Sequence, residues 1–191
     1  MAQMTKRALA AALKELLKKK PLEKITVTDI TEACEVNRQT FYYHFQDIYD
    51  LVEWIYTNDA TRAIDNKKTY ATWQEGFAHI FEYVLDNKAL ILNTYHSMQR
   101  EFLERFLYNE TYMLLYDVVE EMSGGLAVRD EDKAFIAHFY KYAFVGVVLD
   151  WVDNGMKGDA REIVDHVSTV MEGNIVAALE RFQKKRFKAG K

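Results

Sequence analysis

The residues best suited to recognise another molecule lie in one short stretch near the N-terminus. An arginine can address O6 and N7 of guanine, a glutamine can address N6 and N7 of adenine, and a threonine methyl can meet a thymine methyl. Tyrosine and histidine at a helix end can reach phosphates, which position a protein without reading sequence. Six consecutive or nearly consecutive residues offer this chemistry, and we predict that they contact DNA: Arg38, Gln39, Thr40, Tyr42, Tyr43 and His44.

Three short elements are expected to position these residues. Leucines at helical spacing predict an amphipathic helix over residues 5–19, which Pro21 ends. A second helix follows, capped by Thr26 or Thr28, and a connector over residues 35–37 leads to a third helix over residues 38–44. Two short helices bury little alone and need the first helix as backing, so the pattern predicts a three-helix helix-turn-helix domain. Its inward residues are predicted to be Ile30, Ala33, Val36, Phe41 and Phe45.

The segment from Ile25 to Phe45, ITVTDITEACEVNRQTFYYHF, closely resembles the DNA-binding signature of the TetR family of regulators. The resemblance implies a homodimer that places one recognition helix of each subunit in successive major grooves of a palindromic operator. It also adds Thr28, at the start of the second helix, to the DNA-contacting residues. One position departs from the family, because Ile48 stands where a lysine usually grips a phosphate. Either DNA binding is then weaker, or Lys6 and Lys24 compensate.

The rest of the chain is predicted to be a second, larger all-α region. We expect an effector-binding and dimerisation domain over residues 56–191, which follows a DNA-binding domain over residues 1–55. Helical periods predict further helices over residues 73–86, 88–95, 98–122, 130–154 and 159–185. A stretch rich in Phe and Tyr that contains Gly146, Trp151 and Gly155 resembles the TetR subgroup that includes the dihydroxyacetone-kinase operon activator. That resemblance implies a regulator of a metabolic operon.

Aromatic residues are numerous in this larger region and have two readings. They can line a ligand pocket, since helical bundles hold ligands between their helices, or they can simply pack the core and a dimer interface. The candidate ligand-binding residues are Tyr95, His96, Phe102, Tyr112, Tyr116, Phe139 and Trp151.

The last two predicted helices are candidates for a four-helix bundle with a second copy of the chain. Small residues favour close approach of helices, and the final helix has an apolar stripe wider than one neighbour needs. The predicted dimer-interface residues are Gly146, Ile163, Val167, Val170 and Met171.

Composition narrows the function classes. The single cysteine, Cys34, has no disulfide partner, and no histidines pair at metal-ligand spacing, so no metal site and no cofactor are expected. No Ser-His-Asp order, phosphate-binding glycine loop or nucleophile elbow is present, so no enzyme is expected. Charged residues interrupt the most apolar run, residues 135–152, and no secretory signal is evident, so we expect a cytoplasmic protein with no membrane partner.

The sequence therefore predicts a dimeric, sequence-specific transcription regulator, a repressor by default, controlled by a small molecule or a protein effector. The net charge of −4 is compatible with this function because residues 1–50 carry eight basic and seven acidic residues, a weakly basic head on an acidic body. The alternative is a helical effector-binding or protein-binding coregulator that has weakened or lost its affinity for DNA.

Overall fold

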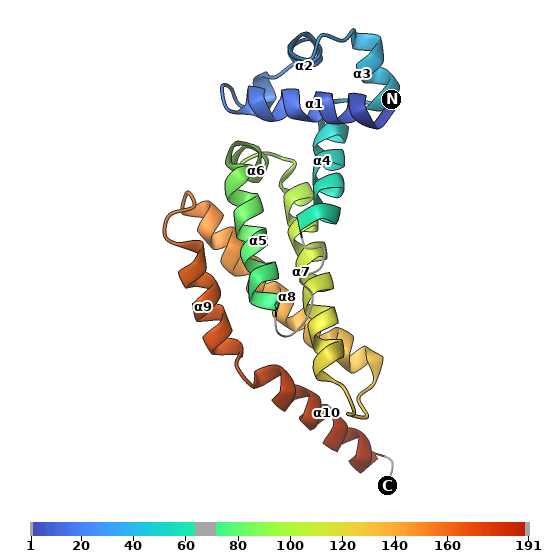
Figure 1. The fold of residues 1–191 in the computed structure, drawn as a ribbon, viewed down its shortest axis with the longest axis vertical. Coiled ribbons are helices and arrows are strands. Elements are labelled where there is room, and N and C mark those ends of the chain that lie inside the picture. The colour runs from blue at the N-terminus through green and yellow to red at the C-terminus, as the bar shows by residue number, and fades with distance from the viewer. Residues whose placement is uncertain (1, 64–71, 190–191) are drawn as a thin grey trace. The chain divides into compact units, whose positions relative to one another are not determined.

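The computed structural model describes residues 2–63 and 72–189, and the side chains within residues 2–58 and 72–186. The described part is all-α and contains no strand (Figure 1). Its contacts divide the chain into two compact units, one formed by residues 1–61 and 84–106 and the other by residues 62–83 and 107–191.

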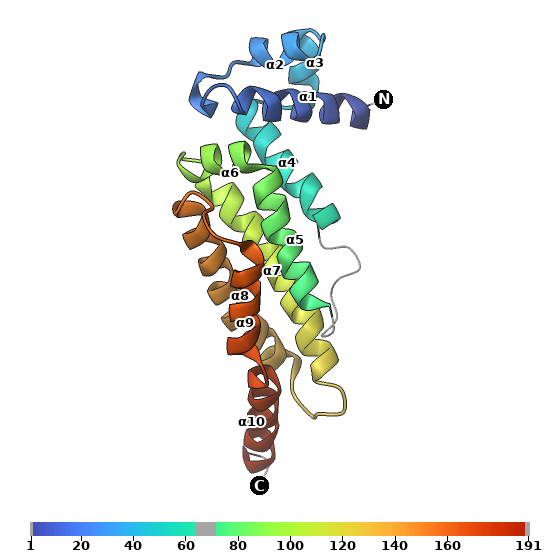
Figure 2. The ribbon, with the colours of Figure 1, turned by 60° about the vertical axis from the view of Figure 1, so that its left-hand side comes forward.

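The first unit begins with α1 (Ala2–Leu17), the 3₁₀ turn η1 (Leu22–Lys24), α2 (Val27–Ala33), α3 (Arg38–His44) and α4 (Ile48–Ala63). Helix α1 lies across both α2 and α3 and contacts each of them (Figures 1 and 2). Leu9, Leu13 and Ile30 are fully buried at this junction. The backing role that the sequence predicts for α1 is therefore confirmed.

Capping explains why these helices begin where they do. Thr26 and Asp29 form a capping box at the start of α2, in which the backbone N–H of Thr26 donates to Oδ2 of Asp29 at 2.7 Å. Asn37 Oδ1 accepts from the backbone N–H of Thr40 at 2.8 Å at the start of α3. Asp47 Oδ1 accepts from Asp50 N–H at 2.8 Å in the first turn of α4. The choice between Thr26 and Thr28 as the cap of α2 is thus settled in favour of Thr26.

One inward residue was predicted wrongly. Phe41 and Phe45 are buried and Val36 is half-buried, but Ala33 is exposed. Ala33 is the last residue of α2, just before the cap Cys34, so its small side chain lies past the part of the helix that packs on α1.

The remaining helices are α5 (Trp73–Asp86), α6 (Lys88–Tyr95), α7 (Arg100–Met122), α8 (Asp130–Asp153), α9 (Ala160–Met171) and α10 (Asn174–Ala189). Aromatic rings from α5 and α8 pack together in the core of the second unit. The ring centroids of Phe77 and Phe144 are 4.4 Å apart, and those of Phe81 and Trp151 are 5.0 Å apart. Offset and edge-to-face contacts at these distances add stability beyond the area that they bury.

The single helix predicted over residues 159–185 is wrong, because the chain breaks between α9 and α10. Gly173 has φ +72, a left-handed conformation that glycine adopts without steric cost, and it ends α9 as a glycine cap does. Figure 1 shows α10 leaving the break in a direction different from that of α9.

Helix α8 is long and apolar enough to cross a membrane by length and composition alone, although charged residues interrupt it. The core helix of a soluble protein passes the same test, and Phe144, Val145 and Val148 of α8 are fully or almost fully buried in the second unit. The helix therefore has a packing role that accounts for its composition.

Candidate nucleic-acid interface

Helix α3 separates its anchoring residues from its outward residues. Phe41 is fully buried, and Phe45, the residue that caps the helix C-terminus, is almost as buried. Tyr43 is 83% exposed and Tyr42 is 51% exposed, although burying a tyrosine ring is usually favourable. Phe41 and Phe45 thus anchor the seven-residue helix α3 in the core, and its other face is accessible to a partner.

The other predicted DNA-contacting residues of α3 are distributed over the same helix. Arg38 and Gln39 are exposed in its first turn, whereas Thr40 and His44 are half-buried. The Thr40 hydroxyl donates to Asn37 Oδ1 at 2.9 Å, which leaves its methyl group as the free part of the side chain. The His44 ring packs edge-on against Tyr43, with centroids 5.0 Å apart.

Two predicted contact residues come from outside α3. Thr28 lies in the first turn of α2 and is half-buried. The ammonium of Lys6, on α1, lies over the rings of Phe45 and Trp54, 5.2 and 5.8 Å from their centroids. A cation held in this way is attracted to the ring face, so Lys6 is oriented before any partner arrives.

Helix α2 is held by an ion pair that the sequence did not indicate. Lys20 Nζ lies 2.8 Å from Asp29 Oδ2, the same oxygen that serves the capping box. The hydrogen bonds from Lys20 and Thr26 lower the pKa of Asp29 from 3.8 to about 2. Burial raises the pKa of the nearby thiol of Cys34, whose Sγ lies 3.0 Å from the Ile30 carbonyl oxygen.

Ile48, the position where a lysine was expected, is half-buried at the start of α4. It lines a hollow of about 200 Å³ together with Ile25, Val27, Tyr42 and Tyr49. The hollow is mostly apolar by area, and its charged lining residues are Glu23 and Asp47, so no lysine or arginine lines it where a phosphate-binding lysine would stand in the family.

The comparisons with known proteins fit this geometry. A family model described as bacterial regulatory proteins of the tetR family matches residues 8–55, and one described as a transcriptional regulator C-terminal region matches residues 71–173. The chain belongs to the tetR family. Like its relatives, this tetR-family protein is a transcriptional regulator and not an enzyme.

Individual tetR-family relatives cover almost the whole chain. The HTH-type dhaKLM operon transcriptional activator DhaS of Lactococcus lactis is 27% identical over 154 residues, which are 80% of this chain and 81% of the relative. A solved structure of the dihydroxyacetone kinase operon activator DhaS has a TM-score of 0.74 at 22% identity and covers 93% of this chain and 97% of its own. NalD of Pseudomonas aeruginosa, the secondary repressor of the MexAB-OprM multidrug efflux pump, has a TM-score of 0.60 at 15% identity and covers 90% and 96%. The two structures share the fold of this tetR-family protein.

The seven candidate ligand-binding residues are divided between the two compact units. Tyr95, His96 and Phe102 belong to the first compact unit, and the other four belong to the second. In the first unit, His96 is exposed. A guanidinium lies over each of the other two rings: that of Arg100 is 4.2 Å from the Tyr95 ring centroid, and that of Arg105 is 5.3 Å from the Phe102 ring centroid.

The four candidate ligand residues in the second unit also differ in surroundings. Tyr112 stacks on His138 at 4.4 Å and lies 5.8 Å from Tyr116, whereas Phe139 is 62% exposed. Trp151 is buried in the core, and its indole N–H has no hydrogen-bond partner among the described residues. Leaving a buried donor unpaired costs stability. Trp151 is therefore the one of the four residues whose buried polar atom would gain from a hydrogen-bond partner.

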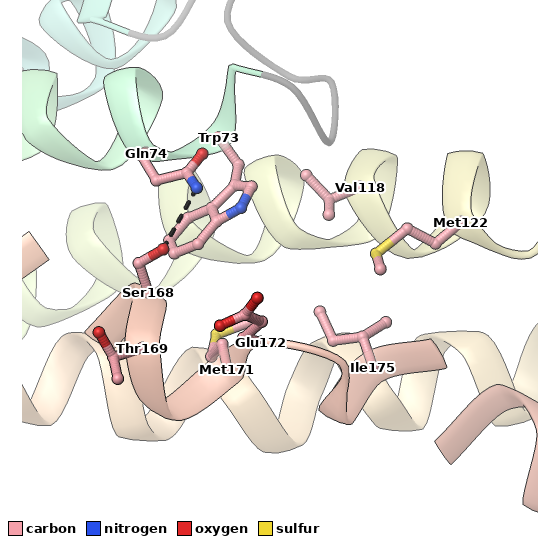
Figure 3. A pocket seen from close by; sticks show the side chains of 9 residues that line it. All are labelled: Trp73, Gln74, Val118, Met122, Ser168, Thr169, Met171, Glu172 and Ile175. Carbon is pink, nitrogen blue, oxygen red and sulfur yellow. Dashed lines mark hydrogen bonds between the residues drawn. The ribbon is translucent and has the colours of Figure 1, made fainter. Parts of the chain in front are cut away.

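A different set of residues lines a cavity in the second unit. Figure 3 shows it between α5, α7 and the break that separates α9 from α10. Its lining residues are Trp73, Gln74, Val118, Met122, Ser168, Thr169, Met171, Glu172 and Ile175. No sequence signal indicates this cavity, because it depends on the break at Gly173 and the periodicity of residues 159–185 predicts one continuous helix.

The five candidate dimer-interface residues differ in burial. Gly146 is exposed, Val170 is 72% exposed, and Ile163 and Val167 are half-buried. Met171 is only 7% exposed and lines the cavity, so it points into its own protomer. No group of three or more His, Cys, Asp or Glu side chains that could hold a metal ion occurs in the described residues.

Proposed function

We propose that this protein is a sequence-specific, DNA-binding transcription regulator that works as a homodimer and reads a palindromic operator with α3. The observation that carries the proposal is the division of α3 between buried Phe41 and an exposed polar face. A major groove about 12 Å wide admits one such helix. Residues 1–55 form the DNA-binding part, and residues 56–191 sense an effector and form the dimer.

The proposal gives each outward residue a role. Arg38 and Gln39, in the first turn of α3, address base edges, because the N-terminal residues of a recognition helix are those that reach the bases. The Thr40 methyl meets a thymine methyl. Tyr42, Tyr43 and His44, together with Thr28 and Lys6, contact phosphates and fix the register of the protein on DNA.

A homodimer is supported by an exposed aromatic face on α8. Phe135, Phe139 and Tyr142 are each about three-fifths exposed, and Gly146 follows one turn later with open space where a Cβ would lie. An exposed apolar patch of this kind usually marks an interface. A second copy that covers this face, along with Val170 on α9, would bury it, and it would also double the number of bases that are read.

Regulation by a small-molecule or protein effector in the cytoplasm completes the proposal. An effector can act only by binding two arrangements of the dimer with different affinities, and thereby changing the spacing of the two recognition helices. The repressor default stays a prediction. Among the relatives the two names differ, since DhaS is named an activator and NalD a repressor.

Gel-shift titration tests the DNA-reading function. The probe is the DNA segment upstream of the gene for this protein, and a scrambled segment of the same length and composition serves as competitor. We expect tight, salt-sensitive binding to the upstream segment, and a loss of roughly 5- to 150-fold in affinity for Arg38→Ala, since a bidentate arginine contact contributes about 1–3 kcal/mol. The control is Arg181→Ala, an exposed arginine on α10. Unchanged binding by Arg38→Ala and Tyr42→Ala would rule out α3 as the reading element.

The second candidate is a coregulator that binds an effector or a protein but has lost its hold on DNA. The apolar hollow around Ile48 favours it, because a phosphate contact expected there is missing. The same titration separates the two candidates. Equal affinity for the upstream and scrambled segments at low salt is the result that the coregulator predicts.

A further inference from the structure

The surface that α3 offers to DNA continues onto the first turn of α4. Four large hydrophobic side chains are exposed within residues 2–58, and they are Met4, Tyr42, Tyr43 and Tyr49. The proposed function assigns Tyr42 and Tyr43 to DNA but gives no role to Tyr49, which is 38% exposed in the first turn of α4. Because burying a tyrosine ring is usually favourable, an exposed ring beside the reading helix points to a partner outside the protomer.

Tyr49 and Tyr42 line the same hollow of about 200 Å³, one from α4 and the other from α3. Val27, the neighbour of Thr28 in the first turn of α2, lines it as well. Under the proposed function both Thr28 and Tyr42 contact phosphates. The hollow therefore adjoins two residues that are assigned to the DNA backbone, and a further contact at its edge would continue the same run of phosphates.

The residues that line the hollow offer hydrogen-bond donors but no cation. Of the nine, Tyr42, Gln46 and Tyr49 carry side-chain donors, and all three are neutral. Glu23 and Asp47 are the charged members of the lining, and both are carboxylates, which repel a phosphate. Attraction of a phosphate to this edge therefore has to come from a neutral donor.

We propose that Tyr49 donates its phenolic O–H to the backbone phosphate that a lysine at position 48 usually contacts in the family, which makes Tyr49 a further DNA-contacting residue. The inference rests on the proposed function. The hydroxyl is available, because it makes no hydrogen bond to another residue in the described ranges 2–58 and 72–186. A neutral donor releases no counterion, so this contact should keep its strength at salt concentrations that weaken a lysine contact.

Tyr49→Phe removes the hydroxyl and keeps the ring. In gel shifts we expect the affinity for DNA to fall roughly 10- to 100-fold, since a hydrogen bond to a charged group is lost. The factor should be the same for the upstream and the scrambled segment, because a phosphate contact carries no sequence information. The slope of log affinity against log salt should not change, whereas Lys6→Gln, which removes a cation, should flatten it by about 0.9. Tyr140→Phe, which removes a half-buried hydroxyl of α8, is the control.

Phosphate ethylation locates the contact. The upstream segment is ethylated at random phosphates, and each ethyl group removes the negative charge and blocks one oxygen. Ethylation of one phosphate per half-site should inhibit binding of the parent protein but not of Tyr49→Phe, and Tyr42→Phe should lose sensitivity at a different phosphate. Ile48→Lys in the Tyr49→Phe protein should restore the affinity and steepen the salt slope by about 0.9. Thermal unfolding of Tyr49→Phe should match that of the parent protein, which excludes a folding defect.

The outcomes separate this inference from the proposed function. An unchanged affinity and an unchanged ethylation pattern in Tyr49→Phe overturn the inference and leave the reading function intact. A loss confined to the upstream segment would make Tyr49 a base-reading residue, and it also overturns the phosphate assignment. A protein that binds both segments equally, and that loses one phosphate contact in Tyr49→Phe, keeps the contact but rejects sequence reading. Absence of binding to either segment rejects both.

Discussion

The backbone N–H of Leu22 donates to Oδ1 of Asn93 at 3.0 Å, across 71 residues of sequence. The same amide of Asn93 donates through Nδ2 to the carbonyl oxygen of Ala89 at 2.7 Å, one turn earlier in α6. The turn η1, which joins α1 to α2, is thereby tied to α6 within the first compact unit. Glu53 and Arg105, whose side chains are 3.2 Å apart, tie α4 to the start of α7 in the same unit.

Asn93→Ala should therefore destabilise the protein by about 1–2 kcal/mol, because it leaves the part-buried N–H of Leu22 without an acceptor. Urea unfolding measures the loss. Asn109→Ala, at an exposed position of α7, is the control, and helix propensity predicts that it is neutral or slightly stabilising. Equal effects of the two changes would mean that the bond to Leu22 contributes nothing.

Glu35→Gly should stabilise the protein. Glu35 has φ +55 in the turn between α2 and α3, a conformation that costs a residue with a Cβ about 1–2 kcal/mol. Part of that gain is offset by the larger entropy of glycine in the unfolded chain, so we expect a net gain of about 0.5–1 kcal/mol. Thermal unfolding measures it. Glu32→Gly, an exposed position inside α2, should instead destabilise by about 1 kcal/mol.

Protonation of Asp29 in acid should make the first unit less stable. Its pKa is lowered from 3.8 to about 2 by Lys20 and Thr26, so the folded state favours the charged form. Its contribution to stability is fully present above pH 3.8 and is lost as the pH falls through about 2. Asp29→Asn should lower the free energy of unfolding at pH 7, and the difference from the parent protein should shrink as the pH approaches 2. A difference that is constant with pH would exclude this source.

Ile48→Lys should strengthen DNA binding. The half-buried side chain lines the hollow together with Tyr42 and Tyr49, and under the proposed function a cation there can reach a phosphate when α3 is in the groove. One added phosphate contact steepens the slope of log affinity against log salt by about 0.9. Gel shifts at several salt concentrations measure the slope. Ile48→Met, which adds length without charge, should leave it unchanged.

Phe139→Asp should dissociate the proposed homodimer and leave the protomer folded. The side chain is 62% exposed, so a charge there costs the isolated protomer little but is buried unpaired in a dimer. Sedimentation velocity reports the oligomeric state, and circular dichroism reports the fold. Met113→Asp, an exposed apolar position of α7, is the control. A Phe139→Asp protein that remains dimeric would place the interface elsewhere.

Local signals account for what the sequence could predict. The bounds of α3 follow from Asn37 as a cap and from the short connector before it, and both are features of neighbouring residues. The burial of Leu9, Leu13, Ile30 and Phe41 follows from helical spacing alone.

The errors arise where tertiary packing decides. Nothing in the periodicity of residues 159–185 distinguishes a helix that contains Gly173 from one that breaks there, and the cavity at the break was missed for the same reason. Met171 belongs to the apolar stripe of α9, but a stripe does not tell which of its residues face the protomer's own core and which face a partner. The aromatic ligand-binding candidates stay a prediction, since they were named by residue type, which carries no information on which rings share a compact unit.

The outward side chains of α3 contribute almost nothing to the core, which Phe41 and Phe45 maintain from the other face. Substitutions at Arg38, Gln39 or Tyr43 therefore carry little cost in folding. Under the proposed function they would change the operator that α3 reads, so that after gene duplication one copy could acquire a new operator through a few such changes while its fold stays intact. The architecture of this one short helix keeps the evolution of target choice separate from the evolution of stability.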